Sequence, residues 1–332
     1  AEIDLNEIDY IIINHSESDH SGALPELMRR IPNVPIYCTA NGVQALKGHY
    51  HQNWNFNVVK TGDRLSLGSR DLIFVEAPML HWPDTMFSYL TKDNILFSND
   101  AFGQHYATEF LFNDKVDQCE LMAEALKYYA NILTPFNKLV QKKIAEFLSL
   151  ELPLDIICTS HGVIWRDNPV QIVEKYLEWS NNYQENQVTI IYDTMWNGTK
   201  ILAEKIVEGL ASATPDVTVK LLNSAKTDKN DIIAEVFKSK AVLVGSPTVN
   251  RGILTSIAAL MEEIRGLGFR GKKAAAFGTY GWSGESVKQV SELLKGAGFS
   301  VIGEGLKAMW SPNDQAKADA VEYGRKIAGL FK

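Results

Sequence analysis

Residues of the types that bind metal ions follow short apolar runs at four places in the first half of this sequence. They form one dense cluster and then three single positions: His15, Glu17, Asp19 and His20, followed by His81, Asp100 and His161. Each apolar run is typical of a strand, and a strand delivers its last residue to the rim of a sheet, where loops meet and ligands bind. Four such rims supply enough imidazole and carboxylate groups to hold two metal ions side by side.

Clustering is what separates this metal-site hypothesis from a structural interpretation of the same residues. A single histidine at a strand end is more often structural than a ligand. His15, Glu17 and Asp19 alternate along the chain, so in an extended segment all three side chains can point to one side. Asp100 can join two metals through its two carboxylate oxygens. The isolated histidines are assigned structural roles: His49, His51 and His105.

The first half of the chain reads as short strands broken by turns and a few helices. Helices are predicted at 118–131, at 134–150 and after Pro169, and the second has Thr134 as its N-cap and Pro135 at its first position. The segments at 86–90 and 95–98 have the pattern of a hairpin. All predicted strands in this half are 10–14, 35–39, 57–60, 72–77, 86–90, 95–98 and 154–159.

From Val188 onward, strands and helices alternate strictly, which predicts a parallel sheet with helices on both faces. A polar stretch at 181–187 marks the boundary, so we expect domains at 1–184 and 185–332. The five predicted strands are 188–192, 217–222, 241–245, 273–277 and 299–302. The predicted helices are 199–211, 231–237, 256–267, 285–296 and 313–330.

Three loops in this second half, at 193–199, 245–252 and 278–284, resemble the cofactor loops of a short-chain flavodoxin. The loop at 193–199 offers hydroxyl, amide and glycine groups ahead of a helix N-terminus, which suits a phosphate dianion. In the sheet order 2-1-3-4-5 that this resemblance implies, the loops at 245–252 and 278–284 flank the topological switch point, where ligands bind. Trp196, together with Tyr280 or Trp282, has the flat apolar surface that would stack on an aromatic ring.

FMN is favoured over NAD or FAD at these loops, because the first loop lacks the G-x-G-x-x-G fingerprint of dinucleotide-binding folds. The candidate FMN-binding residues come from all three loops: Thr194, Met195, Trp196, Asn197, Gly198, Thr199, Pro247, Thr248, Asn250, Gly252, Tyr280, Gly281, Trp282, Ser283 and Gly284.

Composition limits the class of protein and its partners. The chain has 332 residues, 45% of them hydrophobic, and a net charge of −7, which argues against binding to nucleic acid or to an anionic membrane. No apolar run approaches the roughly 18 residues of a membrane span. Cys38, Cys119 and Cys158 form no C-x-x-C pair, so no rubredoxin or zinc-ribbon site is expected within this chain. We expect reduced thiols, a cytoplasmic location and a natural protein that begins before Ala1.

The metal-type residues resemble those of the metallo-β-lactamase fold, an αββα sandwich whose hydrolases carry H-x-H-x-D-H. Glu17 stands at the second histidine of that motif, and a carboxylate there suits redox-active iron better than zinc. The pattern H-x-E-x-D, followed by a single His, Asp and His, resembles the flavodiiron protein family over residues 9–180. The second half resembles a short-chain flavodoxin. The expected fold class is therefore α/β multidomain, a metallo-β-lactamase-like sandwich followed by a flavodoxin-like doubly wound parallel five-stranded sheet.

This resemblance implies a diiron centre as the catalytic group. One iron would be bound by His15, Glu17 and His81 and the other by Asp19 and His161, with Asp100 bridging the two. His20 matches a position that coordinates iron in some members only, so it is either a ligand or a hydrogen-bonding residue that orients one.

The resemblance also implies the reaction and the partners. Family members reduce nitric oxide to nitrous oxide or oxygen to water, and this sequence is most similar to the subtype that reduces nitric oxide in anaerobic detoxification. Electrons would come from a rubredoxin module and an NADH-dependent rubredoxin reductase, and a head-to-tail homodimer, or a homotetramer, would bring FMN to the iron pair. Two alternatives are a dizinc hydrolase fused to a flavodoxin, which Glu17 disfavours, and a flavodoxin-type electron carrier with a vestigial sandwich.

Overall fold

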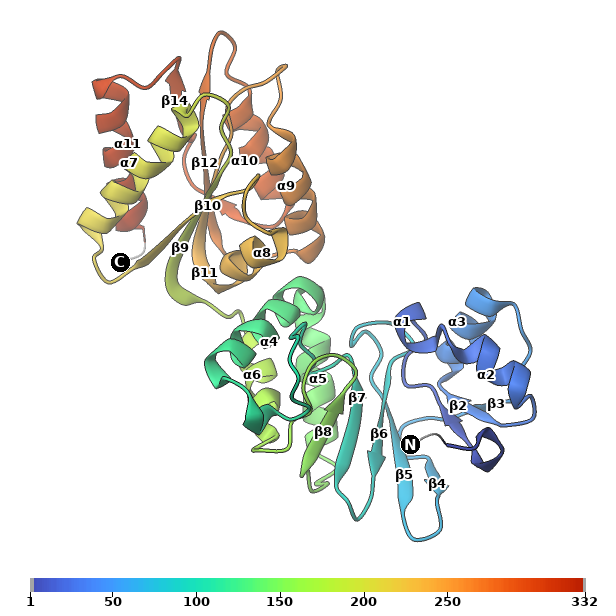
Figure 1. The fold of residues 1–332 in the computed structure, drawn as a ribbon. Coiled ribbons are helices and arrows are strands. Elements are labelled where there is room, and N and C mark those ends of the chain that lie inside the picture. The colour runs from blue at the N-terminus through green and yellow to red at the C-terminus, as the bar shows by residue number, and fades with distance from the viewer. Residues whose placement is uncertain (1–2, 331–332) are drawn as a thin grey trace. The chain divides into compact units, whose positions relative to one another are not determined.

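The computed structural model describes residues 3–330, which separate into two compact units. One unit contains the chain up to Tyr129 together with Phe136–Asn181, and the other contains Ala130–Pro135 and the chain from Asn182 onward (Figure 1). Within residues 3–330, no helix combines the length and apolar character needed to cross a membrane.

Two sheets form the centre of the first unit. Three short parallel strands make the smaller sheet, in the order β1 (Ile11–Ile12), β2 (Ile36–Cys38) and β3 (Phe56–Val58). The larger sheet has the order β4-β5-β6-β7-β8 and is antiparallel except for the β7–β8 pair. Its strands are β4 (Arg64–Ser66), β5 (Asp71–Glu76), β6 (Met86–Leu90), β7 (Ile95–Asn99) and β8 (Ile156–Thr159).

Helices cover the outer faces of these sheets. In Figure 1, α1 (Ser18–Ser21), α2 (Leu24–Arg30) and α3 (Ala40–Tyr50) lie beside the smaller sheet. The helices beside the larger sheet are α4 (Gln118–Ile132), α5 (Asn137–Leu148) and α6 (Val170–Ser180). Between the sheets, Phe74 and Met86 pack with Ile12 and Tyr37, so apolar faces of both sheets meet in one core. This is the αββα layering predicted for the first half.

The predicted start of the second long helix is wrong. Thr134–Phe136 form a 3-10 turn, and α5 begins only at Asn137. The Thr134 hydroxyl donates to the Ala130 carbonyl oxygen at 2.8 Å, so it satisfies a backbone group at the end of α4. A threonine before a proline resembles an N-cap, but here its hydroxyl closes the preceding helix.

The second unit contains a parallel sheet with the strand order β10-β9-β11-β12-β13, which is the predicted 2-1-3-4-5 order. Two short strands occupy the fifth position, because β13 pairs with the start of β12 and β14 with its end. The segment between them contains Gly303 and Gly305, both with positive φ. The strands are β9 (Glu185–Tyr192), β10 (Thr218–Asn223), β11 (Ser239–Gly245), β12 (Lys273–Tyr280), β13 (Ser300–Val301) and β14 (Leu306–Met309).

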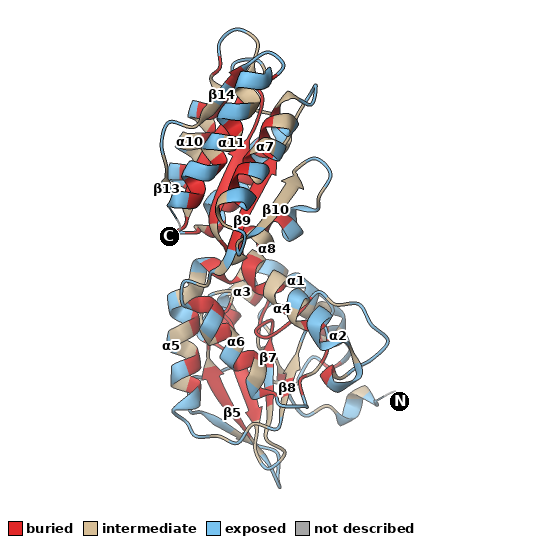
Figure 2. Ribbon diagram, turned by 90° about the vertical axis from the view of Figure 1, so that its left-hand side faces the viewer, coloured by how far each residue is buried: buried red, intermediate tan, exposed pale blue. Residues whose placement is uncertain are grey.

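Helices cover both faces of this sheet. On one face, α7 and α11 pack so closely that a Cβ on Gly209 would lie 2.0 Å from the Val321 carbonyl oxygen. Figure 2 shows buried residues concentrated in the strands and in the inward sides of the helices. The helices of this unit are α7 (Gly198–Ala213), α8 (Lys229–Lys238), α9 (Thr255–Leu267), α10 (Ser286–Gly296) and α11 (Asp314–Gly329).

Candidate metal centre and flavin cavity

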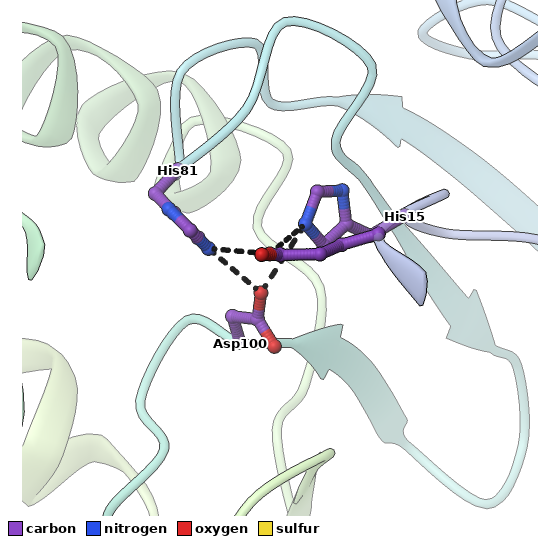
Figure 3. Close-up of side chains that lie close together, drawn as sticks. His15, His81 and Asp100 are labelled. Atoms are coloured by element: carbon purple, nitrogen blue, oxygen red, sulfur yellow. Dashed lines mark hydrogen bonds and ion pairs between the residues drawn. The ribbon is translucent and has the colours of Figure 1, made fainter. Parts of the chain in front are cut away.

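Four predicted ligands from distant parts of the first unit converge on one point. His15 follows β1, Glu17 precedes α1, His81 lies in the loop between β5 and β6, and Asp100 directly follows β7. The His81 Nε2 lies 3.1 Å from Asp100 Oδ2 and 3.4 Å from Glu17 Oε2. The His15 Nε2 lies 3.2 Å from Glu17 Oε2 and 3.5 Å from Asp100 Oδ2. Figure 3 shows the two imidazoles and the carboxylate pointing toward one another.

A second group meets the other oxygen of the same carboxylate. Asp19 and His20 lie in α1, and His161 follows β8. The His20 Nε2 lies 2.9 Å and the His161 Nε2 3.3 Å from Asp100 Oδ1. Asp19 completes the group, with its carboxylate oxygens 3.4 Å from the His20 Nε2 and 3.3 Å from the His161 Nε2. In each of the two groups, the potential ligand atoms all lie within 4.8 Å of one another.

The Asp100 carboxylate is therefore shared between both groups, with Oδ2 on the side of His15 and His81 and Oδ1 on the side of His20 and His161. It is 3% exposed. Burial by itself would raise the pKa of Asp100, but the surrounding imidazoles outweigh it and hold that pKa far below its ordinary value. An ionised carboxylate between two clusters of nitrogen and oxygen ligands is the arrangement that a bridged metal pair requires.

Two buried atoms at the centre of the cluster have no hydrogen bond. They are the His20 Nε2 and the Asp100 Oδ1, which are close in space but not aligned as donor and acceptor. Buried polar atoms are normally paired, because an unpaired one costs about 1–3 kcal/mol. A cation on this side of Asp100 would satisfy both atoms, so the donor set fits a metal ion.

Asp84 holds His15 from the side opposite to the cluster. The His15 Nδ1 lies 3.2 Å from Asp84 Oδ1, and Asp84 also accepts 2.7 Å hydrogen bonds from the backbone N–H and the hydroxyl of Ser16. Burial opposes charge on His15, but the hydrogen bond and charge of Asp84 outweigh it and raise the pKa of His15. With Nδ1 held by Asp84, Nε2 is the nitrogen presented to the cluster. The sequence analysis missed Asp84, although it follows His81 by three residues.

The remaining histidines lie outside both ligand groups, among the described residues. His105 is the nearest of them, with its ring 5.8 Å from that of His161 and 4.9 Å from that of Tyr128. His49 stacks on Trp82 at 6.3 Å, and His51 ends α3 with a left-handed backbone. Their assignment to structural roles stays a prediction.

The second unit contains a cavity of about 560 Å³ at the carboxyl ends of its strands. Eleven predicted flavin-binding residues line it: Thr194, Met195, Trp196, Gly198, Pro247, Thr248, Asn250, Tyr280, Gly281, Trp282 and Ser283. Sequence analysis did not select five further lining residues: Val249, Arg251, Thr279, Trp310 and Ser311. Trp310 and Ser311 follow β14, the strand that the sequence did not predict.

Four predicted residues support the cavity without lining it. Asn197 precedes α7 with a left-handed backbone, and the buried Thr199 hydroxyl lies 2.9 Å from the Thr279 hydroxyl. Gly252 exchanges two backbone hydrogen bonds with Val249. Gly284 has a φ of 72°, a conformation that favours glycine.

The loop before α7 leaves donors free for an anion. No side chain caps the N-terminus of α7, and the buried Thr194 hydroxyl has no hydrogen-bond partner. Unpaired N–H groups at a helix N-terminus attract phosphate oxygens. This loop therefore fits the phosphate of a nucleotide, and the aromatic side chains that line the cavity fit a flat ring.

Each of the two units matches a known protein family. Residues 190–324 match the flavodoxin family, and residues 1–162 match the family described as ODP family beta lactamase. The anaerobic nitric oxide reductase flavorubredoxin of Escherichia coli, from strains O1:K1 and K12 alike, is 57% identical over 329 residues, which cover 98% of this chain and 68% of that protein.

Solved structures also superimpose on nearly the whole chain. The rubredoxin oxygen:oxidoreductase of Desulfovibrio gigas has a TM-score of 0.95 and 37% identity, with 99% of this chain and 82% of that chain covered. The flavodiiron protein of Giardia intestinalis has a TM-score of 0.92 and 32% identity, with 98% and 80% covered. These matches confirm the predicted fold class, a metallo-β-lactamase-like unit followed by a flavodoxin-like unit.

Proposed function

The chain belongs to the flavodiiron protein family, and from this premise we propose that it reduces nitric oxide to nitrous oxide at an iron pair that receives electrons from FMN. The observation that carries the proposal is the division of one buried carboxylate, Asp100, between two groups of ligands. A hydrolytic or electron-carrying protein would have no need for both this centre and a flavin cavity.

One iron would be held by His15, Glu17 and His81, and the other by Asp19, His20 and His161, with Asp100 available to both. His20 is included as a ligand because its Nε2 belongs to the second group and makes no hydrogen bond. The centre then combines four imidazoles with three carboxylates. Such a mixture of nitrogen and hard oxygen ligands suits iron, whereas structural and catalytic zinc sites are mostly four-coordinate.

The cavity of the second unit would hold FMN. Thr194 and the N-terminus of α7 would bind the phosphate, and the aromatic residues Trp196, Tyr280 and Trp282 would contact the ring. FMN would supply electrons, and an iron pair held by these seven side chains would supply the redox chemistry on a small diatomic substrate. The protein's contribution is positioning, because Asp100 contacts both ligand groups and would hold two irons close enough for two substrate molecules to react.

The choice between nitric oxide and oxygen as the substrate rests on the names of two relatives and on how similar each is to this chain. Two NO with two electrons and two protons give N2O and one water, whereas O2 with four electrons and four protons gives two waters. The E. coli relative at 57% identity is named a nitric oxide reductase, and the D. gigas relative at 37% identity is named an oxygen oxidoreductase. Nitric oxide is the first candidate because the more similar relative is named for it, and oxygen is the second.

Membership of the flavodiiron family supports assembly with a second copy. In a head-to-tail homodimer or tetramer, a partner subunit would bring its iron pair to this flavin. A rubredoxin module and an NADH-dependent rubredoxin reductase, in the cytoplasm, would supply the electrons.

The test uses the full chain loaded anaerobically with Fe(II) and FMN and reduced by NADH through a rubredoxin and its reductase. We expect N2O formation by gas chromatography to exceed O2 consumption in a matched assay. Asp100→Asn should keep FMN and lose both activities with at least one iron, while Asp9→Asn, at an exposed carboxylate of the same unit, should match the parent protein.

Three results would overturn the proposal: stoichiometric zinc without iron in cells grown with iron, full activity in the Asp100→Asn variant, or the absence of FMN from the loaded protein. Faster turnover of O2 than of NO would select the second candidate reaction instead.

A further inference from the structure

Arg251 is the one charged residue among the described residues that line the flavin cavity. Every other lining side chain is neutral, and most are aromatic, hydroxyl-bearing or small. The guanidinium is exposed and makes no hydrogen bond or ion pair with any described residue. A positive charge that lines a site for an anionic ligand is expected to interact with that ligand.

The backbone that carries Arg251 is fixed on both sides. Val249 and Gly252 exchange two backbone hydrogen bonds of 3.2 and 2.7 Å, which close a two-residue turn around Asn250 and Arg251. Both turn residues have positive φ, 48° and 58°, as a tight hairpin turn requires. The Gln289 side chain in α10 donates a 2.6 Å hydrogen bond to the Arg251 carbonyl oxygen. The loop backbone is thus held in place, so the guanidinium can move only through the side-chain rotamers of Arg251.

The phosphate of FMN has its own binding elements on another loop. The N-terminus of α7 and the Thr194 hydroxyl supply neutral donors, and residues 193–199 include no lysine or arginine. Arg251 lies in the loop between β11 and α9, which also contributes Pro247 and Thr248 to the cavity. Its charge is therefore available to the isoalloxazine ring.

We propose that Arg251 raises the reduction potential of bound FMN by stabilising the negatively charged reduced ring, an inference that rests on the proposed binding of FMN. The neutral oxidised flavin takes up two electrons and one proton to give the reduced anion, whose charge lies along the N1–C2 carbonyl edge. A guanidinium that lines the ring cavity attracts the reduced form and leaves the neutral form almost unaffected. Electrons come from the rubredoxin-type donor in the enzyme and from dithionite in the test.

The experiment compares midpoint potentials of FMN in the full-length protein by anaerobic dithionite titration. We expect Arg251→Gln to weaken binding of reduced relative to oxidised FMN about three- to tenfold, a fall of ~15–30 mV in the two-electron potential. Arg251→Lys keeps the charge and should retain most of the potential. Arg270→Gln is the matched control, because it removes an exposed charge just before β12, at the opposite end of the same sheet. Raising the salt concentration should shrink the difference, since the charge is exposed.

Two further measurements separate an effect of Arg251 on the ring from an effect on the phosphate. They are the dissociation constants of oxidised FMN and of riboflavin, which lacks the phosphate. A lower potential in Arg251→Gln, with oxidised FMN bound as tightly as before, supports the proposal. An unchanged potential overturns it, as does a variant that loses affinity for FMN but not for riboflavin, because Arg251 would then bind the phosphate. Failure of the parent protein to bind FMN would instead remove the premise and the proposed function with it.

Discussion

The His20 Nε2 lies 2.9 Å from the Asp100 Oδ1, and neither buried atom takes part in a hydrogen bond. Both atoms also face the group formed with Asp19 and His161. If His20 only oriented a ligand, its Nε2 would donate to an aligned acceptor. The geometry instead favours His20 as a ligand in its own right.

His20→Ala should therefore remove the second iron and leave the first. We expect affinity for the second iron to fall on the order of 100-fold, because losing a ligand should cost at least as much as losing a residue that only orients one. FMN content should stay the same. Iron per chain, measured by mass spectrometry after dialysis against a chelator, should fall from two toward one. His105→Ala is the control, because its ring lies 5.8 Å from His161 but outside both ligand groups. Two irons retained in the His20 variant would contradict the assignment.

The metal cluster could be predicted from sequence because each ligand follows a segment with a clear strand pattern. The apolar runs before His15, Asp100 and His161 all form strands, and a strand end leaves little freedom in where the next side chain lies. Asp84 was missed for the opposite reason. It lies in the turn between β5 and β6, where no periodic pattern indicates which way a carboxylate points.

The flavin cavity was predicted less completely, since part of it depends on an irregular strand. β14 contains Lys307 between apolar residues and follows a glycine-rich segment, so its sequence carries only a weak strand signal. Trp310 follows β14 and joins the cavity only because that strand pairs with the end of β12. Pairing between segments that are distant in sequence cannot be read from local pattern alone.

Asp84→Asn should weaken iron binding without unfolding the protein. Asparagine keeps the shape and can still accept the Ser16 backbone hydrogen bond, but it lacks the charge that holds the His15 ring. We expect affinity for the first iron to fall about 10–100-fold, measured by competition with a chromophoric chelator. Asp93→Asn, which removes an exposed partner of Arg70, should leave metal affinity unchanged. Equal affinities in the two variants would show that Asp84 has no role in orienting His15.

Gly162→Ala tests whether close packing positions His161. A Cβ at Gly162 would lie 2.0 Å from Gln104 Oε1 and 2.6 Å from the Gln104 carbonyl oxygen, and φ there is 80°. Gly62 has a similar φ of 91°, but its Cβ would meet nothing within 4 Å. Gly62→Ala should therefore cost about 1–2 kcal/mol of unfolding free energy from backbone strain alone.

Gly162→Ala should cost a further 1–3 kcal/mol or so from overpacking. It should also lower occupancy of the second iron, because the adjacent His161 must move when the loop shifts. Urea denaturation and metal analysis of both variants give the comparison. Equal stability and equal iron content in the two variants would show that the loop yields without displacing His161.

Lys272 is a buried cation in the second unit and is 5% exposed. Its ammonium group donates to three backbone carbonyl oxygens, at 3.0 Å to Tyr183, 2.7 Å to Phe237 and 2.7 Å to Ser239. Burial lowers the pKa of Lys272 to about 7, against the opposing influence of the Glu185 charge. The side chain thus connects the start of β9 to the end of α8 and the start of β11.

This depressed pKa makes stability rise with pH. An unfolded lysine keeps its proton up to a pKa of about 10.4, so between pH 7 and that value the unfolded chain binds more protons than the folded one. The free energy of unfolding should then increase with pH across this interval, by at most about 1.4 kcal/mol per unit for one proton. Lys272→Met should lose this slope between pH 7.5 and 9.5, whereas Lys295→Met, at an exposed position in α10, should keep it. Urea unfolding at several pH values measures the difference. Parallel curves for the parent protein and Lys272→Met would mean that the three carbonyl oxygens keep the buried ammonium charged throughout.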